Sequence, residues 1–324
     1  MKMSCLLALA LTVFTVPAAN AQSAADFPHA PVKILVPFAA GGPTDVVARI
    51  LGEQLSARWG GKPVVIENRP GAGTIVATAA VAKSAPDGHT LLMATNSLLI
   101  NPAISHSLPY DTATELAPVS MIATQPVALV ATKSFEGKTI ADVVAAAKNE
   151  PVNYTSPGPR GVGHFAGEML KQRSGIPTGN FTHINYNGSA PALTDVMAGR
   201  VPLMFDIWHS ARRHVESGAL KLVAGASTER LPGAKDVPSI NESYPGFEVM
   251  AFNAIVAQGG TPAPVVEKLS ADIRAIVASE AFLERVKNLG INAYGNTPAE
   301  LGAWMAREIA RWQEVAKAAN IKAE

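Results

Sequence analysis

The pattern of apolar and polar positions changes its period early in the chain and predicts a strand followed by a helix. Residues 32–38 form a short apolar run rich in β-branched side chains and bounded by prolines, which is typical of a buried strand. From Thr44 the apolar positions recur at helical spacing, and Gly60-Gly61 ends that pattern. A turn of small residues over 39–43 joins the two periods. The sequence therefore predicts a strand–turn–helix unit near the start of the fold.

The turn of this unit has the features of an anion site. Gly41 and Gly42 leave the backbone bare, and glycine accepts positive φ angles at no steric cost. The following helix directs unpaired N–H groups and the positive end of its dipole to the same place. Such a terminus suits a carboxylate or a phosphate. The alternative interpretation is that any connection from a strand to a helix needs a glycine.

Strand and helix patterns keep alternating after this unit, which predicts an α/β fold. Apolar runs at residues 64–67 and 90–95 are expected strands, and an alanine-rich segment between them is an expected helix. Two longer apolar stretches, residues 119–132 and 247–257, are predicted to cross between two lobes. The return crossing means that both ends of the chain build one lobe and the middle builds the other.

The predicted crossings set the domain boundaries. Lobe one would comprise residues 22–125 and 248–324, and lobe two residues 126–247. The roughly 300 residues from position 22 of this 324-residue chain exceed the usual size of one domain, which agrees with this division. Each lobe is expected to be a mixed, mostly parallel sheet flanked by helices. Ligands of such sheets lie beyond the carboxyl ends of the strands.

Three local signals refine the expected elements. The segment Thr139-Ile140-Ala141-Asp142 resembles a capping box at a helix start. The segment Thr297-Pro298-Ala299-Glu300 combines an N-cap, a proline at the first helical position and an acidic third residue, so a helix is predicted to begin there. Pro202 opens an expected strand and suggests an edge strand, because proline cannot donate to a ladder.

The first 21 residues have the pattern of a cleavable export signal. Lys2 precedes an apolar run over residues 6–16, and Ala19-Asn20-Ala21 fits the small-x-small cleavage pattern, so the mature chain is expected to begin at about Gln22. The apolar run is too short to span a bilayer, which needs about 20 residues. The sequence thus predicts export to the periplasm. Cys5 is the only cysteine, so disulfides are not expected.

The net charge of the chain limits the kind of partner that it is expected to bind. Removal of Lys2 from the 27 basic residues leaves 26, against 26 acidic residues, so the mature chain is formally neutral. Nucleic-acid and membrane-surface binding both need clustered Lys and Arg, and the sequence shows no such excess. A small-molecule ligand is therefore favoured over nucleic acid.

Seven segments in the same order resemble the substrate-binding proteins of tripartite tricarboxylate transporters, the Bug family. These segments are VPFAAGGPTD (36–45), ENRPGAG (67–73), PDGHTLL (86–92), YTSPG (154–158), HFAGE (164–168), GSAPALTD (188–195) and GRVPLMFD (199–206). The resemblance implies a two-lobed periplasmic-binding-protein fold that closes on a small carboxylate and delivers it to a two-component integral membrane permease. A monomer is expected, with no cofactor and no metal.

The resemblance also implies where the ligand binds. In the family the loop that matches residues 38–42, together with the helix start at Thr44-Asp45, holds one carboxylate partly through water. The loop that matches residues 156–164 meets the other end of the ligand. The candidate ligand-binding residues are Phe38, Ala39, Gly41, Gly42, Thr44, Asp45, Asn96, Ser156, Arg160, Gly163, His164, Tyr186 and Asp206.

Four of these residues have alternative interpretations. Tyr186 would belong to a turn at a strand end, or to the cleft wall as the resemblance implies. Arg160 would pair with a second acidic group of the ligand or would be a solvated loop charge. Asp206 would receive a ligand amine or hydroxyl or would cap a helix. His164 would donate or accept a ligand hydrogen bond or would pack in the core.

Enzymatic interpretations find little support in the sequence. It contains no G-x-S-x-G elbow, Walker A or H-E-x-x-H motif. His209 and His214 are five residues apart, whereas metal pairs on a helix favour four. Ser156 with His164 as nucleophile and base has no visible third partner. The sequence therefore favours a passive receptor, with an exported hydrolase or transferase and a ligand-loaded partner of a membrane sensor as the alternatives.

Overall fold

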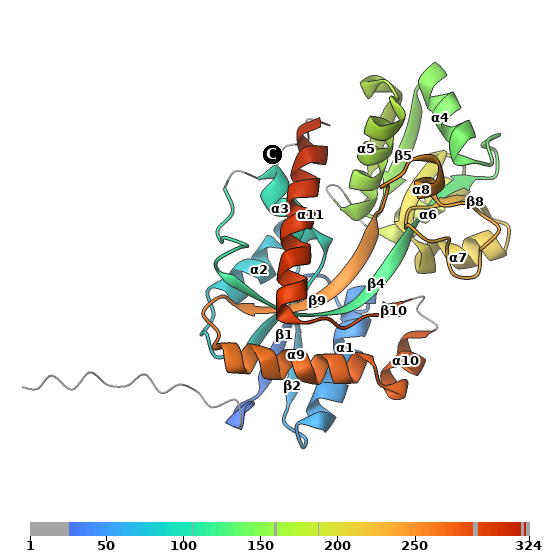
Figure 1. The fold of residues 1–324 in the computed structure, drawn as a ribbon. Helices are drawn as coiled ribbons and strands as arrows, with labels where there is room; N and C mark the ends of the chain where they lie inside the picture. The colour runs from blue at the N-terminus through green and yellow to red at the C-terminus, as the bar shows by residue number, and fades with distance from the viewer. Residues whose placement is uncertain are drawn as a thin grey trace, which may run out of the picture.

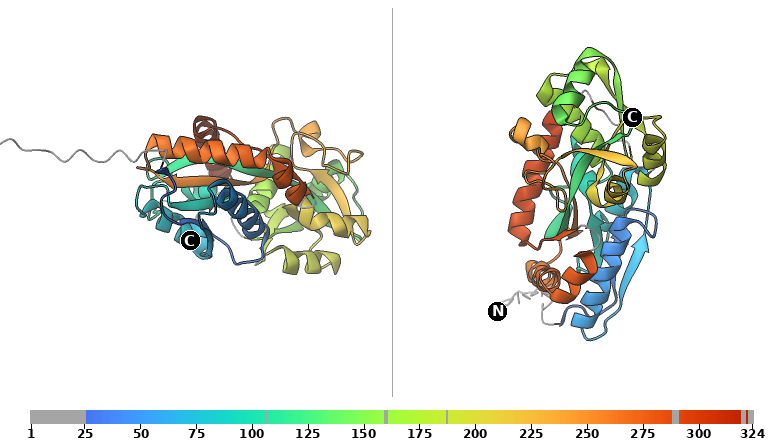
Figure 2. Two further views of the ribbon diagram at one scale, coloured as in Figure 1. Left: turned by 90° about the horizontal axis from the view of Figure 1, so that it is seen from below. Right: turned by 90° about the vertical axis from the view of Figure 1, so that its right-hand side faces the viewer.

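The computed structural model describes residues 26–105, 107–158, 161–186, 188–287, 291–318 and 321. The predicted export signal, residues 1–21, and Arg160 lie outside the described residues. Among the helices of the described ranges, none is both long and apolar enough to cross a membrane. Figure 1 shows an elongated molecule in which α4 (Ile140–Asn149) and α9 (Ala263–Val277) lie at opposite ends, and Figure 2 gives two further views.

Strands and helices alternate along the chain, as the sequence predicts. Up to the first long strand the elements are β1 (Val32–Val36), α1 (Pro43–Arg58), β2 (Val64–Asn68), the 3-10 turn η2 (Ala72–Thr74), α2 (Ile75–Ala82), β3 (Thr90–Ala94), α3 (Asn96–Ile104) and β4 (Leu116–Thr132). The middle of the chain then forms α4, β5 (Val152–Ser156), α5 (Val162–Ser174), η3 (Thr178–Asn180), β6 (Phe181–Asn185), α6 (Ser189–Met197), β7 (Leu203–Ile207), α7 (Trp208–Glu216), β8 (Leu220–Gly225) and α8 (Ile240–Ser243). The last elements are β9 (Met250–Gln258), α9, α10 (Glu280–Lys287), β10 (Asn292–Ala293) and α11 (Pro298–Ala318).

The described strands form one mixed sheet with the order β2-β1-β3-β9-β4-β7-β5-β6, and β8 and β10 also pair with β4. Strand β1 runs parallel to β2 and β3, and β5 runs parallel to β6 and β7. The two long strands β4 and β9 run antiparallel to each other. The α/β prediction with mixed sheets flanked by helices is confirmed.

The sheet has two halves that share strand β4. Residues 116–126 of β4 pair with β9, whereas residues 127–132 pair with β7 and β8. We call the part with β1, β2, β3, β9 and β10 the first half and the part with β5, β6, β7 and β8 the second half. Figure 1 shows β4 and β9 running together from one half towards the other. These strands occupy the two long apolar stretches of the sequence.

Alternate residues of each strand pack into different cores, because successive side chains of a strand point to opposite faces. In β1, Ile34 and Val36 join a core under α1, α9 and α10, whereas Leu35 joins a core under α2, α3 and α11. In β4, Leu129 belongs to that second core and Val130 to a third core under α6 and α7. The second core extends through both halves, where Trp312 of α11 meets Phe165 of α5 at a ring-centroid distance of 5.3 Å.

Both predicted capping boxes are present. Thr139 and Asp142 exchange hydrogen bonds with each other's backbone at the start of α4. At the start of α11, the Thr297 N–H donates to Glu300 and the Glu300 N–H donates to Thr297 Oγ1. The edge-strand prediction from Pro202 is wrong, because β7 lies between β4 and β5. Pro202 precedes that strand and offers its carbonyl to the Thr132 N–H, so no ladder donor is lost.

Candidate functional site

A cavity of about 770 Å³ lies where the two halves of the sheet meet, and both halves line it. We call it the main cavity. Nine of the thirteen candidate residues line it, namely Phe38, Ala39, Gly41, Gly42, Thr44, Asn96, Ser156, Gly163 and Asp206. Asp45, His164 and Tyr186 lie outside the lining, and Arg160 lies outside the described residues. The structure therefore brings together candidate residues that are up to 168 positions apart in the sequence, from Phe38 to Asp206.

Six of the described helices begin at the main cavity. The lining includes their N-cap residues, namely Gly42 of α1, Thr74 of α2, Thr95 of α3, Gly161 of α5, Gly188 of α6 and Ile207 of α7. None of the six makes a side-chain capping hydrogen bond. By contrast, α4, α8 and α11 have capping boxes and begin away from the cavity. Helices that begin at the cavity thus leave their first N–H groups to another partner.

The electrostatic consequence is a positive potential made by backbone rather than by side chains. Each helix start carries the positive end of a macrodipole, equal to roughly half an elementary charge. The described lining contains no lysine, arginine or histidine. Converging helix starts of this kind favour an anion with a compact charge, such as a carboxylate.

Asp45 shapes the turn before α1 rather than lining the cavity. Its Oδ2 accepts from the Gly41 N–H at 2.8 Å and from Arg49 Nε at 2.9 Å, and its Oδ1 accepts from Asn68 Nδ2 at 2.9 Å. Although burial raises the pKa of Asp45, the hydrogen bonds from Arg49 and the Gly41 N–H lower it below its usual value. Asn68 also donates to the Phe38 carbonyl. The ionised Asp45 therefore fixes both ends of the turn that lines the cavity.

Asp206 is the ionisable residue of the described lining, and it is 1% exposed. Its Oδ1 accepts from Ser189 Oγ at 3.0 Å and from the Ile207 N–H at 2.8 Å. Its Oδ2 has no hydrogen-bond partner among the described residues. Burial raises the pKa of Asp206 to about 7. The N-cap residue of α7 is Ile207 and not Asp206, so the helix-cap interpretation of Asp206 is wrong. Because buried polar atoms are normally hydrogen-bonded, its unpartnered Oδ2 indicates a donor that is not among the described residues.

Ser156 has a different histidine partner from the one considered in the sequence. Its Oγ lies 2.8 Å from His183 Nε2 and donates to the Gly158 carbonyl. Burial lowers the pKa of His183 to about 4, so the imidazole is neutral at pH 7. The ring of His164 stacks on that of His183 at 4.1 Å, which places His164 behind the lining. No sequence motif marks His183, because its proximity to Ser156 arises from the pairing of β5 with β6.

The structure also adds polar residues that sequence reasoning missed. Gln125 of β4 and Asn253 of β9 line the cavity, and Gln125 Nε2 donates to Asn253 Oδ1 at 3.1 Å. Asn96 joins α3 to β9 through the Met250 carbonyl and the Phe252 N–H. Gln125 and Asn253 each stand within one of the two long apolar stretches of the sequence. Because a buried polar group needs a hydrogen-bond partner, their positions could have marked them as candidate site residues.

Tyr186 packs against the core of the second half and is not part of the cavity lining. Its hydroxyl donates to Asp195 Oδ2 at 2.5 Å. That hydrogen bond raises the pKa of Tyr186, and it holds the end of β6 against α6. The structure therefore gives Tyr186 a role in positioning the start of α6, whose N-cap Gly188 lines the cavity.

Comparisons with known proteins agree with this geometry. The model of the tripartite tricarboxylate transporter family receptor matches residues 47–321 of the chain. R. palustris Rpa4515 with adipate is 32% identical, covers 92% of this chain and 99% of its own, and superposes with a TM-score of 0.81. MatC (Rpa3494) from Rhodopseudomonas palustris with bound malate is 32% identical over 89% and 99% of the two chains, with a TM-score of 0.76. The periplasmic binding protein BugD is 33% identical over 92% and 100%, with a TM-score of 0.78.

Proposed function

This chain belongs to the family of tripartite tricarboxylate transporter receptors, and from that membership we propose that it captures a small carboxylate in the main cavity and delivers it to a two-component integral membrane permease. The observation that carries the proposal is the convergence of six uncapped helix starts on that cavity. One such terminus stabilises an anion by about 0.3 to 1 kcal/mol at a surface and by up to about 2 kcal/mol when partly buried. A carboxylate that reaches two or three of them gains a useful binding energy without any charged side chain.

The position of Asp206 adds a second requirement for the ligand. Asp206 lines the main cavity, and its buried Oδ2 has no hydrogen-bond partner among the described residues, so this acceptor needs a donor. A hydroxyl or an ammonium group of the ligand would supply that donor, whereas an ionised carboxylate beside Asp206 would be repelled. We place the ligand carboxylate at the turn before α1 and a donor group near Asp206. The malate bound to the similar MatC carries both kinds of group.

We further propose that the two halves of the sheet act as lobes that close on the ligand. Lobe one would be residues 22–125 and 248–324, and lobe two residues 126–247. The change of partner along β4, between residues 126 and 127, supports this boundary, because the strand leaves one ladder there and enters the other. Hinge motion between packed units is a common response to a ligand that both units contact.

Export and partners form the third part of the proposal. The similar BugD is a periplasmic binding protein, and the signal pattern of residues 1–21 agrees with the same location. We propose a monomeric receptor in the periplasm with no cofactor and no catalytic step. The sensor-partner alternative shares the ligand site, so capture of a sensor ectodomain would distinguish it from transport.

The first experiment is a thermal-shift screen of the mature chain from Gln22, refolded from denaturant to remove any carried-over ligand. The panel contains mono-, di- and tricarboxylates, hydroxy acids, acidic amino acids and aromatic acids, with the matching amides as uncharged controls. A ligand at a hundred times its dissociation constant adds about 2.7 kcal/mol to the free energy of unfolding. We expect one class of acid to raise the melting temperature and to be recovered chemically unchanged. An absence of any shift, or conversion of the acid, would contradict the receptor proposal.

Asp45→Ala tests the geometry of the site with a matched control. The variant loses the acceptor for the Gly41 N–H and Asn68, so we expect weaker binding of the acid found in the screen. Asp142→Ala removes a comparable first-turn carboxylate that accepts the Lys138 and Thr139 N–H groups far from the cavity. Titration calorimetry should show reduced affinity for Asp45→Ala alone. Equal affinities in the two variants would count against the turn before α1 as the carboxylate site.

A further inference from the structure

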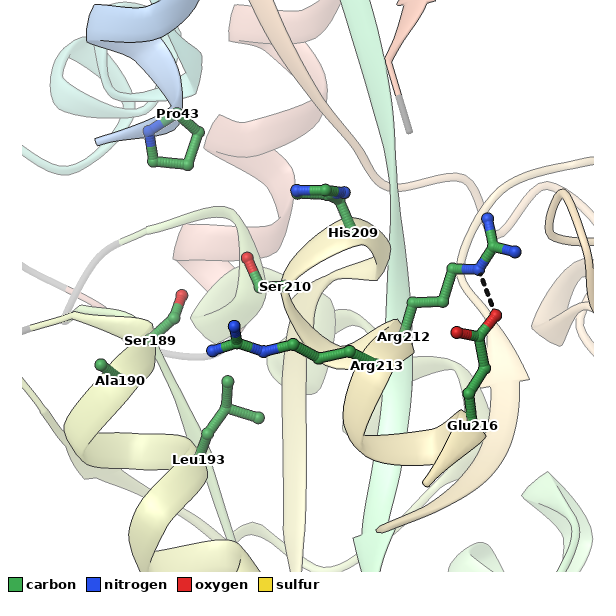
Figure 3. A pocket seen from close by; sticks show the side chains of 9 residues that line it. All are labelled: Pro43, Ser189, Ala190, Leu193, His209, Ser210, Arg212, Arg213 and Glu216. Carbon is green, nitrogen blue, oxygen red and sulfur yellow. Dashed lines mark hydrogen bonds and ion pairs between the residues drawn. The ribbon is translucent and has the colours of Figure 1, made fainter. Parts of the chain in front are cut away.

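A second cavity of about 510 Å³ adjoins the main cavity. The two share Pro43, Ser189 and Ser210 as lining residues, so they are contiguous at this point. Figure 3 shows the second cavity between Pro43, at the start of α1, and the side chains of α6 and α7. Both halves of the sheet thus contribute to it, as they do to the main cavity.

The charges in the second cavity are unbalanced. Arg212 Nε donates to Glu216 Oε1 at 2.7 Å, which neutralises one positive charge. Arg213 Nε donates to His214 Nε2 at 3.2 Å, and within the described residues no carboxylate pairs with Arg213. In Figure 3 the guanidinium of Arg213 extends towards Ser189, away from Glu216. One cation is therefore directed to the junction of the two cavities without an internal counter-charge.

The pKa of His209 reflects the same excess of positive charge in the second cavity. Burial lowers the pKa of His209, and the charges of Arg213 and Arg212 lower it further. In Figure 3 its ring lies between Pro43 and the arginines. The second cavity therefore combines a positive potential with donors from Arg213, Ser210 and a neutral imidazole, which is suitable chemistry for a carboxylate.

We infer that the second cavity is an outer anion subsite, which takes the second acidic group of a ligand whose first carboxylate occupies the main cavity. This inference rests on the proposed function. It assigns the ligand to the dicarboxylates, with a chain long enough to pass the shared residues Ser189 and Ser210. Arg213 supplies the fork of donors that a carboxylate fits, and Arg212 stays with Glu216.

The test compares each dicarboxylate with the monocarboxylate of the same length. The probes are succinate, adipate and suberate against butyrate, hexanoate and octanoate, measured by titration calorimetry in the mature chain. Because Arg213 is exposed, its pair with a carboxylate is worth up to about fivefold in affinity. We expect Arg213→Gln to reduce the preference for the matching dicarboxylate by about that factor and to leave monocarboxylate binding unchanged. The wild-type preference should also decrease with added salt.

Two further variants serve as controls. The double variant Arg212→Gln with Glu216→Gln changes the lining without changing its net charge, so it should keep the preference. Arg213→Lys retains the charge and should restore part of it. If monocarboxylates and dicarboxylates bind but Arg213→Gln alters neither preference nor salt dependence, the subsite is wrong and the proposed function stands. If an acid of the thermal-shift panel binds but none of these dicarboxylates does, the subsite is likewise wrong, and if no acid of that panel binds the wild type, the proposed function itself has failed.

Discussion

Among single residues, Asp206 has the most demanding environment of the candidate site. It is a buried carboxylate with two donors on one oxygen and none on the other among the described residues. Burial without a positive partner raises the pKa of Asp206 to about 7. Its protonation therefore changes near neutral pH, where an unperturbed aspartate is fully ionised. Ser189 and Ile207 retain their acceptor in either state.

The first prediction concerns the pH dependence of stability in Asp206→Asn. Between pH 4 and pH 7 the folded wild type holds a proton on Asp206 that the unfolded chain has lost, so its free energy of unfolding decreases as the pH rises. The decrease is at most about 4 kcal/mol, since the pKa differs by about 3 units at about 1.4 kcal/mol each. Asparagine cannot ionise and escapes this loss. We expect the stability of the variant relative to wild type to increase from pH 5 to pH 8.

Urea denaturation of both proteins at pH 5, 6, 7 and 8 measures this difference. Asparagine leaves a buried amide to be satisfied, which costs free energy at every pH, so the slope against pH is the relevant result. Asp45→Asn serves as the control, because the pKa of Asp45 is lowered in the folded state, so its carboxyl is ionised in both the folded and the unfolded chain from pH 5 to pH 8 and the stability difference of this variant should stay constant over that range. A stability difference between Asp206→Asn and wild type that stays constant with pH would contradict a raised pKa of the buried Asp206 carboxyl.

At the scale of elements, close contact between a helix and a strand positions the ligand loops. Helix α5 begins at Gly161, and Gly163 in its first turn lies against β5 and β7. A Cβ at Gly163 would meet the Phe205 carbonyl oxygen at 2.6 Å and Ser156 Cβ at 2.7 Å. These are backbone or strand atoms that cannot turn aside. Glycine is therefore required for α5 to start at the cavity wall.

The second prediction follows from that contact. In Gly163→Ala the start of α5 must move away from β7, which displaces the N–H groups that face the cavity. Overpacking of this kind costs about 1 to 3 kcal/mol of stability. We expect a lower melting temperature and at least a tenfold loss of affinity for the acid found in the screen. Titration calorimetry and thermal unfolding measure the two effects.

Gly179→Ala is the matched control, at a glycine outside the lining of the main cavity. A Cβ at Gly179 meets no atom within 4 Å, and the residue does not have a positive φ. Its affinity should remain within about twofold of wild type and its stability should not decrease. If the two alanine variants bind the acid equally well, the start of α5 does not contribute to the site.

At the scale of the whole molecule, the main cavity depends on the relative position of the two halves of the sheet. Residues of both halves line it, and β4 and β9 connect them. Helix α11 also packs against α3 of the first half and α5 of the second. A ligand that contacts both halves stabilises their closed arrangement, whereas the unliganded protein is free to populate a more open one.

The third prediction is a change of overall dimensions on binding. We expect the radius of gyration to decrease when the acid found in the screen is added at saturation, because the lobes close around it. Small-angle X-ray scattering of the mature chain measures this value. An acid that produces no thermal shift should leave the radius unchanged. Saturating ligand with an unchanged radius would show that the halves are already in their bound arrangement.

The sequence by itself determined the elements and the family. Apolar periodicity predicted β1, α1 and the two long strands, because burial of one face or both faces of an element is encoded in local spacing. The capping boxes at Thr139 and Thr297 were equally local, and ordered segments from Val36 to Asp206 indicated the family. Nine of the thirteen candidate residues line one cavity, because the family segments that carry them lie in loops at strand ends, where α/β sheets bind their ligands.

Only the tertiary structure decided which of these residues meet. The contact of Ser156 with His183, the turn held by Asp45 and Asn68, and the central place of β7 all depend on strand order and register, which no local pattern contains. The same holds for Arg213, which is an ordinary helix residue in the sequence and faces the cavity junction in the fold. Spacing along the chain records how each element is buried, whereas the meeting of distant side chains is set by how the elements pack.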